Sequence, residues 1–296
     1  MSGFVDLHIH SDRSSDGDHS PFELVRLAAE NGFVAISIAD HDTVAAYPEA
    51  LEAARNSGVE VVPSLEVTTL FGGREFHLLL PFCPWESPVI GKICERVSEG
   101  RLVEARERVE KLRALGLDIS WEEVAQATKS TPPLGVTIAQ ILLDKPGSKN
   151  DPVLKKYNEG DARRRAPYHF YRDYFMEGKP AFAAKRHMPL LDVLELSRPT
   201  GAVPVLAHPG AYFQKTTRED LVELKERGLA GLEVYTSYHD PGQTAFYAAA
   251  AKELDLVPTA GSDFHGRIKP HIFFGYIKDG GLWMVEELKK RRGVND

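Results

Sequence analysis

Residues 3–10 read Gly-Phe-Val-Asp-Leu-His-Ile-His, a short apolar run that carries two histidines at its end. The run up to Ile9 is typical of a buried strand. Because alternate side chains of a strand point to the same face, His8 and His10 leave this strand on one side. Two imidazoles from one rigid segment can bind one metal ion, although such a pair taken alone also suits an ordinary polar face.

Strand-like and helix-like segments alternate on either side of a central region. Further strands are expected at 34–39, 59–67, 75–80, 202–207, 231–235, 256–260 and 272–277. Helices are expected from the capping Ser20 to Gly32 and at 43–57, 217–227, 241–254 and 283–290. Repeated strand-helix units predict an α/β protein with a largely parallel sheet, either open or closed into a barrel.

The central region follows a different pattern. Apolar residues recur there at helical spacing, as Leu102, Ala105, Val109, Leu112 and Leu115. Residues 128–187 are rich in Pro, Lys, Arg and Asp and hold no clear strand. We interpret 97–187 as a mainly helical insertion that acts as a cap, and 1–96 with 188–296 as one discontinuous catalytic domain.

Composition narrows the classes of function. The 296 residues are 43% hydrophobic and 27% charged, as in a globular protein with a substantial core. The net charge of -7 argues against stable binding to duplex nucleic acid, which needs many Lys and Arg contacts to phosphates. A local basic pocket for a small anion remains compatible with that charge.

Two further features concern the cellular setting. The first residues lack the basic and apolar regions of a signal peptide, and no apolar run approaches the roughly 20 residues that span a bilayer. Cys83 and Cys94 stand in no metal or redox spacing, so we interpret them as small buried hydrophobic residues. These observations predict a cytoplasmic protein without a membrane partner.

The placement of the histidines carries most of the functional information. The chain has eleven, and six of them lie at the ends of expected strands or within them: His8, His10, His41, His77, His208 and His265. Asp16, Glu66 and Asp263 accompany them. Catalytic residues of βα barrels come from the ends of several strands, so these groups are expected to converge. Clustered imidazoles and carboxylates suit Zn, Mn or Fe.

Taken together, these motifs resemble the PHP (polymerase and histidinol phosphatase) family. They are HxHSxxSSDG from His8, ADHD around His41, PSLEV with Glu66, AHPG with His208, and GSDFHG with Asp263 and His265. They follow one another from end to end of the chain. The resemblance implies a distorted (β/α)7 barrel with the helical insertion added to it.

The resemblance also implies a site for two to three divalent metal ions. One ion would bind His8, His10, Glu66 and Asp263; a second would share Glu66 and add His77 and His208; a third would bind Asp16, His41 and His265. Such ions lower the pKa of bound water and stabilise charge on a phosphoryl group. Asp263, His41 and His265 are the expected catalytic residues, and Asp40 and Asp42 are expected to support His41.

Substrate recognition is less specified. Lys185 in GKPAFAAK, His239 and Arg13 are candidate substrate-binding residues, and each also suits an ordinary surface position. The insertion resembles that of stand-alone family members acting on nucleotides and RNA ends. Their Arg-Pro-His-Ile-Ala-like motif is here replaced by residues 134–139, Leu-Gly-Val-Thr-Ile-Ala, which lack both basic groups. This departure leaves nucleotide specificity open.

Two clusters in the insertion allow either a binding or a structural interpretation. The aromatic residues Tyr168, Phe170, Tyr171, Tyr174 and Phe175 suit base stacking or, more commonly, the apolar stripe of a helix. The run Arg163-Arg164-Arg165 is typical of a solvated face.

The leading expectation is a metal-dependent phosphatase that hydrolyses a small phosphate monoester, such as a nucleotide or nucleoside bisphosphate. The alternatives are a 5'-3' exonuclease on short RNA or DNA, a histidinol-phosphate phosphatase, and a non-catalytic metal-binding PHP module. The acidic net charge and the helical cap favour a closed pocket over a long groove. The sequence predicts no oligomeric state.

Overall fold

Two β-sheets form the framework of the protein. The computed structural model describes residues 3–128, 132–159 and 165–293. The strands are β1 (Phe4–Ile9), β2 (Phe33–Ile38), β3 (Glu60–Val61), β4 (Glu66–Phe71), β5 (Arg74–Leu79), β6 (Met188–Pro189), β7 (Val205–Leu206), β8 (Gly231–Thr236) and β9 (Val257–Gly261). They form a three-stranded sheet, β1-β2-β3, and a six-stranded sheet, β6-β4-β5-β7-β8-β9.

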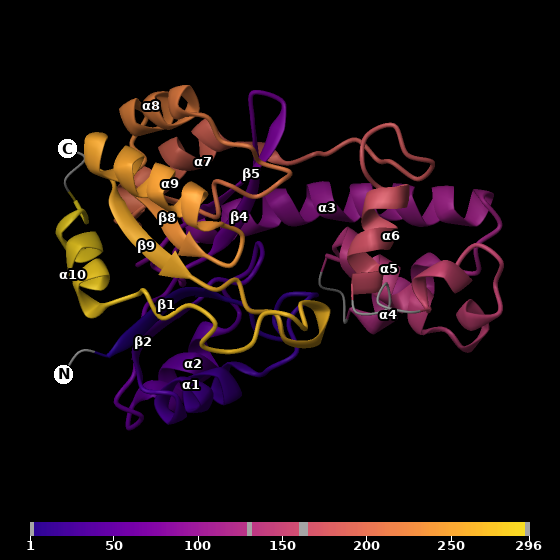
Figure 1. Ribbon diagram of the computed structural model, residues 1–296, viewed down its shortest axis with the longest axis horizontal. Helices are drawn as coiled ribbons and strands as arrows, with labels where there is room; N and C mark the ends of the chain where they lie inside the picture. Colours follow the sequence, from indigo (N-terminus) through magenta and orange to yellow (C-terminus); the bar gives the residue numbers. More distant parts are fainter. Residues whose placement is uncertain (1–2, 129–131, 160–164, 294–296) are drawn as a thin grey trace.

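Ten α-helices accompany the strands in the described part of the chain. They are α1 (Pro21–Glu30), α2 (Tyr47–Ala54), α3 (Pro88–Ala114), α4 (Trp121–Ala127), α5 (Gly135–Asp144), α6 (Ala166–Tyr174), α7 (Leu190–Ser197), α8 (Arg218–Glu226), α9 (Pro241–Glu253) and α10 (Leu282–Lys290). In Figure 1, α7, α8 and α9 lie on one side of the larger sheet, and α1 and α2 lie against β1 and β2. No helix among these combines the length and hydropathy needed to cross a bilayer.

The strands are parallel except β5, which runs antiparallel to both β4 and β7. The reason is local. Gly72 and Gly73 form the two-residue loop between β4 and β5, with φ angles of 55° and 74°. Two-residue hairpin loops of this kind need positive φ at both positions, which glycine adopts without a steric penalty. The tight turn brings His77 on β5 opposite Thr68 on β4, beside Glu66.

The two sheets meet at two isolated parallel bridges, Ile9 with Phe264 and His41 with Glu66. The α/β class predicted from the sequence is therefore confirmed. The closed seven-stranded barrel is not confirmed, because the ladders in the described residues end at these two junctions. His41 and Glu66 are themselves expected metal ligands, and Ile9 and Phe264 are each flanked by two more. The candidate site thus lies where the sheets meet.

Some predicted elements differ in the structure. The expected strand at 272–277 is wrong: Gly275 has a φ of 80° and Tyr276 N–H donates to Phe273 O, so the chain turns there. The expected strand at 59–67 is divided into β3 and β4 on either side of Pro63, whose nitrogen has no hydrogen to donate to a ladder. The buried Ile272 and Ile277 explain why the turn has the hydrophobicity of a strand.

The central region has a hydrophobic core of its own. Residues between 105 and 181 form one buried cluster, which includes Val109, Leu142 and Phe170. The long helix α3 joins this cluster to the sheets, because its first turns place Ile90 and Ile93 in the core of the larger sheet. Figure 1 shows α3 extending from the sheets to α4, α5 and α6. The expected division at residue 97 falls inside α3, and the two-domain assignment stays a prediction.

Candidate metal centre

Glu66, the first residue of β4, is fully buried at the centre of the site. Its side chain contacts imidazoles from five different positions along the chain. Oε2 lies 3.2 Å from His8 Nε2, 3.2 Å from His10 Nε2 and 3.1 Å from His41 Nδ1, and Oε1 lies 2.8 Å from His77 Nδ1 and 3.2 Å from His208 Nε2. One carboxylate therefore joins ligands from both sheets.

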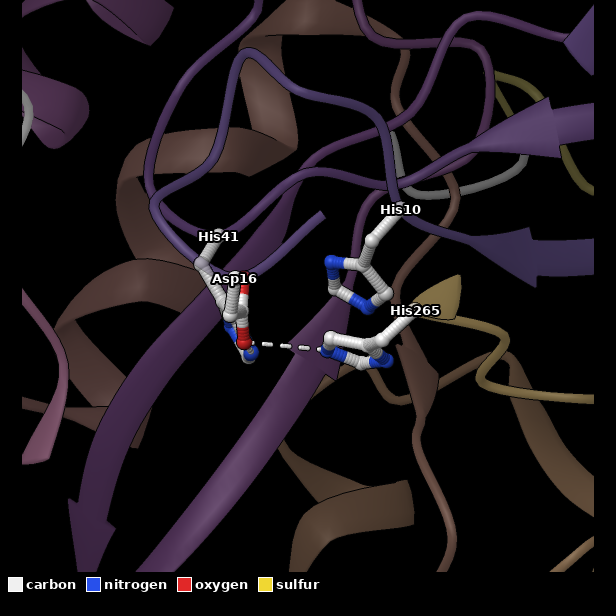
Figure 2. A group of neighbouring side chains, drawn as sticks. All are labelled: His10, Asp16, His41 and His265. Atoms are coloured by element: carbon white, nitrogen blue, oxygen red, sulfur yellow. Dashed lines mark ion pairs between the residues drawn. The ribbon is translucent and has the colours of Figure 1, made fainter. Parts of the chain in front are cut away.

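Two more carboxylates complete the cluster. Asp263 Oδ1 lies 3.1 Å from His10 Nε2 and 3.3 Å from His265 Nδ1. Asp16 Oδ2 lies 3.0 Å from His265 Nε2 and 3.6 Å from His41 Nε2. Figure 2 shows these four side chains (His10, Asp16, His41 and His265) pointing toward one another, with the Asp16–His265 ion pair dashed.

The structure brings all nine expected metal ligands together. Three groups have potential ligand atoms within 4.8 Å of one another: His8, His10, Glu66 and Asp263; His10, Asp16, His41 and His265; and His41, Glu66 and His77. The first group matches an expected ligand set, and the second contains another with His10 added. In the third, His41 stands where His208 was expected, although His208 also contacts Glu66. The assignment of ligands to individual ions stays a prediction.

The donor atoms are suited to a cation. His8 Nε2, both ring nitrogens of His10, His41 Nδ1 and Glu66 Oε2 are buried and make no hydrogen bond with the described residues. Buried polar atoms without partners are rare, because leaving them unpaired is costly. Imidazole nitrogens and carboxylate oxygens converging in this way fit divalent transition-metal ions.

The backbone bends sharply where the ligands leave the strands. Asp42, His208 and Asp263 adopt positive φ angles of 57°, 26° and 55°. Such conformations are uncommon for residues with a Cβ, and they gather at functional sites where surrounding structure holds them in place. Here each lies just after a strand or next to a ligand, so the bend directs side chains into the cluster.

Two buried carboxylates, Asp40 and Asp6, hold the backbone next to the metal ligands. Asp40 accepts hydrogen bonds from the Ser11 N–H and hydroxyl, at 2.7 and 2.5 Å, which fixes the loop after His10. Asp6 accepts from the His8 and Ser262 N–H groups at 3.2 and 3.0 Å. Burial raises the pKa of both carboxyls to about 6. These groups shape the backbone beside the ligands, and Asp40 does so through Ser11 rather than through a contact with His41.

The charges of the ligands depend on one another. Burial opposes the ionised forms of Glu66 and Asp263, but His41 beside Glu66 and Lys269 beside Asp263 hold both pKa values well below their usual range. Burial also opposes charge on His10, but the adjacent carboxylates of Asp263 and Glu66 outweigh it and raise the pKa of His10 to about 9. A metal bound there takes the place of a proton.

The cluster opens into a cavity between the sheets and the helical region. Its walls include Asp16, His41, His77, His208, Asp263 and His265 on the sheet side, and Leu134, Gly135, Val136, Tyr168 and Tyr171 on the helical side. Arg101, Glu104, Arg108 and His187 also line it. The helical region thus forms one wall of the cavity, and its role as a cap stays a prediction.

The three candidate substrate-binding residues do not reach this cavity. Lys185 pairs with Glu75, and Arg13, which is partly exposed, pairs with Glu49. Both ring nitrogens of His239 are used locally: Nδ1 lies 2.8 Å from Val234 O, and Nε2 accepts from Gly210 N–H at 2.9 Å. Their side chains are satisfied by neighbouring protein groups, so they stand apart from the metal cluster.

Other cations line the cavity instead. Lys269 is buried, contacts Asp263 through its ammonium group, and donates to Tyr238 Oη at 2.8 Å. Arg101 contacts Asp42, and Arg108 lies 2.5 Å from Glu104 Oε1. The sequence analysis did not identify these residues. The sequence could have indicated the two arginines of α3, because the charged residues at 101, 104 and 108 recur at helical spacing and so share one face of the helix.

Residues 134–136 explain how the altered motif is accommodated. A Cβ at Gly135 would lie 2.6 Å from the Tyr171 ring and 2.8 Å from Arg108 Nη1. Both distances are too short for a real contact, so glycine allows the Arg108 guanidinium to lie against this backbone. The helical region therefore presents a cation here from α3 rather than from the motif itself.

Comparisons with known proteins agree with this geometry. The PHP domain family model matches residues 6–129. The chain is 29% identical over 267 residues to a 5'-3' exoribonuclease of Haemophilus influenzae, covering 90% of this chain and 91% of the relative. It is 28% identical to a 3',5'-nucleoside bisphosphate phosphatase of Chromobacterium violaceum, covering 88% and 87%. A Bifidobacterium adolescentis structure assigned as a metal-dependent phosphoesterase superposes with a TM-score of 0.84, at 26% identity, covering 97% and 96%.

Proposed function

We propose that this chain, whose residues 6–129 match the PHP domain model and which is similar to metal-dependent phosphoesterases over most of its length, hydrolyses a phosphate ester of a small phosphorylated nucleotide. The observation that carries the proposal is the buried Glu66, which contacts five imidazoles. Three of these imidazoles, those of His41, His77 and His208, line the cavity. The name of the Chromobacterium violaceum relative, a 3',5'-nucleoside bisphosphate phosphatase, supports nucleoside bisphosphates as the substrate class.

The proposed cofactors are two to three divalent ions, Mn, Zn or Fe, held by the nine ligands. When bound, such ions polarise a water molecule and stabilise negative charge on the phosphoryl group. Asp263, His41 and His265 are the proposed catalytic residues, because each is a potential ligand and also lines the cavity. Lys269 keeps Asp263 ionised, which its contact and the lowered pKa of Asp263 support.

The helical side of the cavity is the proposed recognition surface. Tyr168 and Tyr171 offer rings to a base, and Arg101 and Arg108 offer cations to a second charged group. A cap over the metal centre also restricts water and bulky chains, which strengthens electrostatic interactions inside. We propose that residues 97–187 act as this cap and that the two sheets are parts of a distorted barrel.

A second candidate is a 5'-3' exonuclease on short single strands. The name of the Haemophilus influenzae relative supports it, and so does a wider outer cavity that continues from the inner one. A histidinol-phosphate phosphatase and a non-catalytic metal-binding module are the remaining alternatives, and the substrate screen described next separates all four.

The test is a substrate screen with Mn, Zn and Fe supplied separately. Phosphomonoesters, nucleoside bisphosphates, histidinol phosphate and short oligonucleotides would each be assayed with the unmodified protein and with Asp263→Ala. We expect Asp263→Ala to reduce hydrolysis by several orders of magnitude, because ligand loss removes the metal chemistry. Asp279→Ala changes an exposed carboxylate and is the matched control. Retention of more than about a tenth of the activity, a barrier change under ~1.4 kcal/mol, would contradict the site.

A further inference from the structure

Hydrogen bonds join the loop after β1 to the start of α5 in the helical region. Thr137, which is buried, donates from its hydroxyl to Ser15 O at 3.1 Å, and its Oγ1 lies 3.2 Å from Ser15 Oγ. Ser15 Oγ accepts from the Leu134 N–H at 3.2 Å. Leu134 is the N-cap residue of α5 and its side chain makes no capping bond, so Ser15 binds a backbone donor that helix starts leave free. We call the Ser15–Thr137 contact the latch.

On the sheet side, the latch belongs to a compact loop that carries a metal-ligand candidate. The Ser14 hydroxyl donates to Asp16 Oδ1 at 2.7 Å, and the Ser14 N–H donates to Ser11 O at 3.2 Å. A Cβ at Gly17 would lie 2.0 Å from Ser11 O, so the two ends of the loop are in direct contact. Because Ser15 stands between Ser14 and Asp16 in this tight loop, a displacement of Ser15 also displaces Asp16.

On the helical side, α5 is packed against its own region rather than against the sheets. Its apolar residues, Ile138 and Leu142 among them, belong to the buried cluster of the helical region. The three hydrogen bonds above are the only ones that join residues 134–144 to any described residue outside that region. Beside them lies a space of about 430 Å³, lined by Gln140 on α5 and by Asp18 on the sheet side. The attachment of α5 at this point therefore depends on the latch.

The latch also stands at the cavity that holds the metal cluster. Asp16 lines this cavity from the sheet side, and residues 134–136 line it from the helical side. The same contact that holds the start of α5 against the loop thus holds two opposite walls of the cavity at a fixed separation. Thr137 is one of the residues that replace the basic motif, so the altered stretch has a structural role here.

We propose that Ser15 and Thr137 are positioning residues that couple closure of the helical region to metal binding at Asp16, His41 and His265. This inference rests on the proposed function, to which the metal ions belong. Coupling of this kind is reciprocal: if a docked α5 raises the affinity of Asp16 for an ion, a bound ion stabilises the docked α5 by the same factor. The metal site is then complete only when the cavity is closed.

The first experiment measures metal affinity in matched variants. Thr137→Val keeps the shape of the side chain and removes the hydroxyl, and Thr137→Ser keeps the hydroxyl. In competition with a chelating dye, with Mn and with Zn in turn, Thr137→Val should raise the Kd of the weakest-bound ion ~5-fold or more, and Thr137→Ser should restore it. Thr128→Val removes a buried hydroxyl that bonds within the helical region and should leave the Kd unchanged.

The second experiment measures the reciprocal effect without any assay of activity. Hydrogen–deuterium exchange of the amides in 134–144 reports how firmly α5 is docked. Adding the metal should slow this exchange in the unmodified protein and in Thr128→Val, and should not change it in Thr137→Val. Ser15→Ala removes the latch from the loop side and should give the same two results as Thr137→Val. A purely structural role would speed the exchange equally with and without metal.

The outcomes separate this inference from the proposed function. If the unmodified protein binds metal and shows metal-dependent exchange in 134–144 but hydrolyses no phosphate ester, the proposed function fails and the coupling stands. If it hydrolyses phosphate esters but Thr137→Val and Ser15→Ala keep both the Kd and the metal-dependent exchange, the coupling is overturned. The coupling is likewise overturned if the unmodified protein binds no ion, or if the bound ion leaves exchange in 134–144 unchanged.

Discussion

Glu233 Oε1 lies 3.0 Å from His8 Nδ1, and both side chains are fully buried. The contact fixes the ring so that Nδ1–H donates to the carboxylate and Nε2 faces Glu66. Glu233 Oε2 also accepts from the His208 N–H at 2.8 Å, so one carboxylate positions two metal ligands. A Cβ at Gly261 would lie 2.1 Å from Glu233 Oε1, which explains the need for glycine at that point.

Glu233→Gln should weaken metal binding. Glutamine keeps one acceptor oxygen, and its NH₂ group then faces one of the two N–H donors. Loss of such a supporting partner costs ~10–100-fold in metal affinity or activity. Competition with a chelating dye measures the affinity directly, with the exposed Glu195→Gln as the control. Unchanged affinity in Glu233→Gln would show that His8 does not need this carboxylate.

The protein should bind two to three divalent ions per chain. Eight ligand side chains in overlapping groups, with Glu66 shared and His208 beside it, leave room for more than one ion. Elemental analysis of protein purified without chelator measures the stoichiometry. Removing the ions should also lower the thermal midpoint, because a ligand at 100 times its Kd stabilises the folded state by ~2.7 kcal/mol. One ion or none after reconstitution with Mn would disprove the multinuclear assignment.

Lys185→Ala should reduce kcat/KM by a similar factor for a nucleotide and for an aryl phosphate. Burial opposes the charge of Glu75, but Lys185 holds its pKa well below the usual range. Glu75 in turn lies 3.3 Å from His77 Nε2, so the effect reaches a metal ligand rather than the substrate. Lys185→Arg keeps the charge and should restore most of the activity. A rise in KM confined to the nucleotide would instead show direct recognition.

Phe170→Ala should destabilise the helical region. Phe170 is fully buried in the cluster formed by residues 105–181, beside Tyr157 and Phe175. Truncating a buried phenylalanine costs ~3–5 kcal/mol through lost burial and the cavity left behind. Chemical denaturation measures the change in the free energy of unfolding. Phe273→Ala, at a ring that is 63% exposed, is the control and should stay within about 0.5 kcal/mol of the unmodified protein.

Both cysteines should react slowly in the native protein. Burial raises the pKa of Cys83 and of Cys94 from 9.0 to about 12, and the charge of Asp42 adds to the shift at Cys94. A raised thiol pKa lowers the thiolate fraction at every pH below it, so at pH 8 the reactive form is roughly 10³-fold rarer than in an ordinary thiol. Labelling with a chromogenic disulfide should be fast in denaturant and slow without it. Rapid native labelling would contradict the burial of Cys83 and the partial burial of Cys94.

Local sequence patterns anticipated much of the architecture. Capping residues and apolar periodicity located α1, α8 and α9, and the short apolar runs located β1, β2 and β8. The segment 272–277 was mistaken for a strand because Ile272 and Ile277 are buried from a turn. Apolar content reports burial, and a turn whose ends are buried gives the same signal as a strand.

The sequence by itself determined the set of metal-ligand candidates. In HxH and DxH pairs at strand ends, the two side chains point to the same face whatever the rest of the fold is. The structure brings eight of them into overlapping groups and His208 into contact with Glu66, while how they share ions stays a prediction. Only the tertiary structure decided which cations face the cavity. Lys185, His239 and Arg13 had suitable motifs but are satisfied by Glu75, backbone groups and Glu49. Lys269, Arg101 and Arg108 reach the cavity because helix and loop packing aims their long side chains, and that direction depends on contacts remote in sequence.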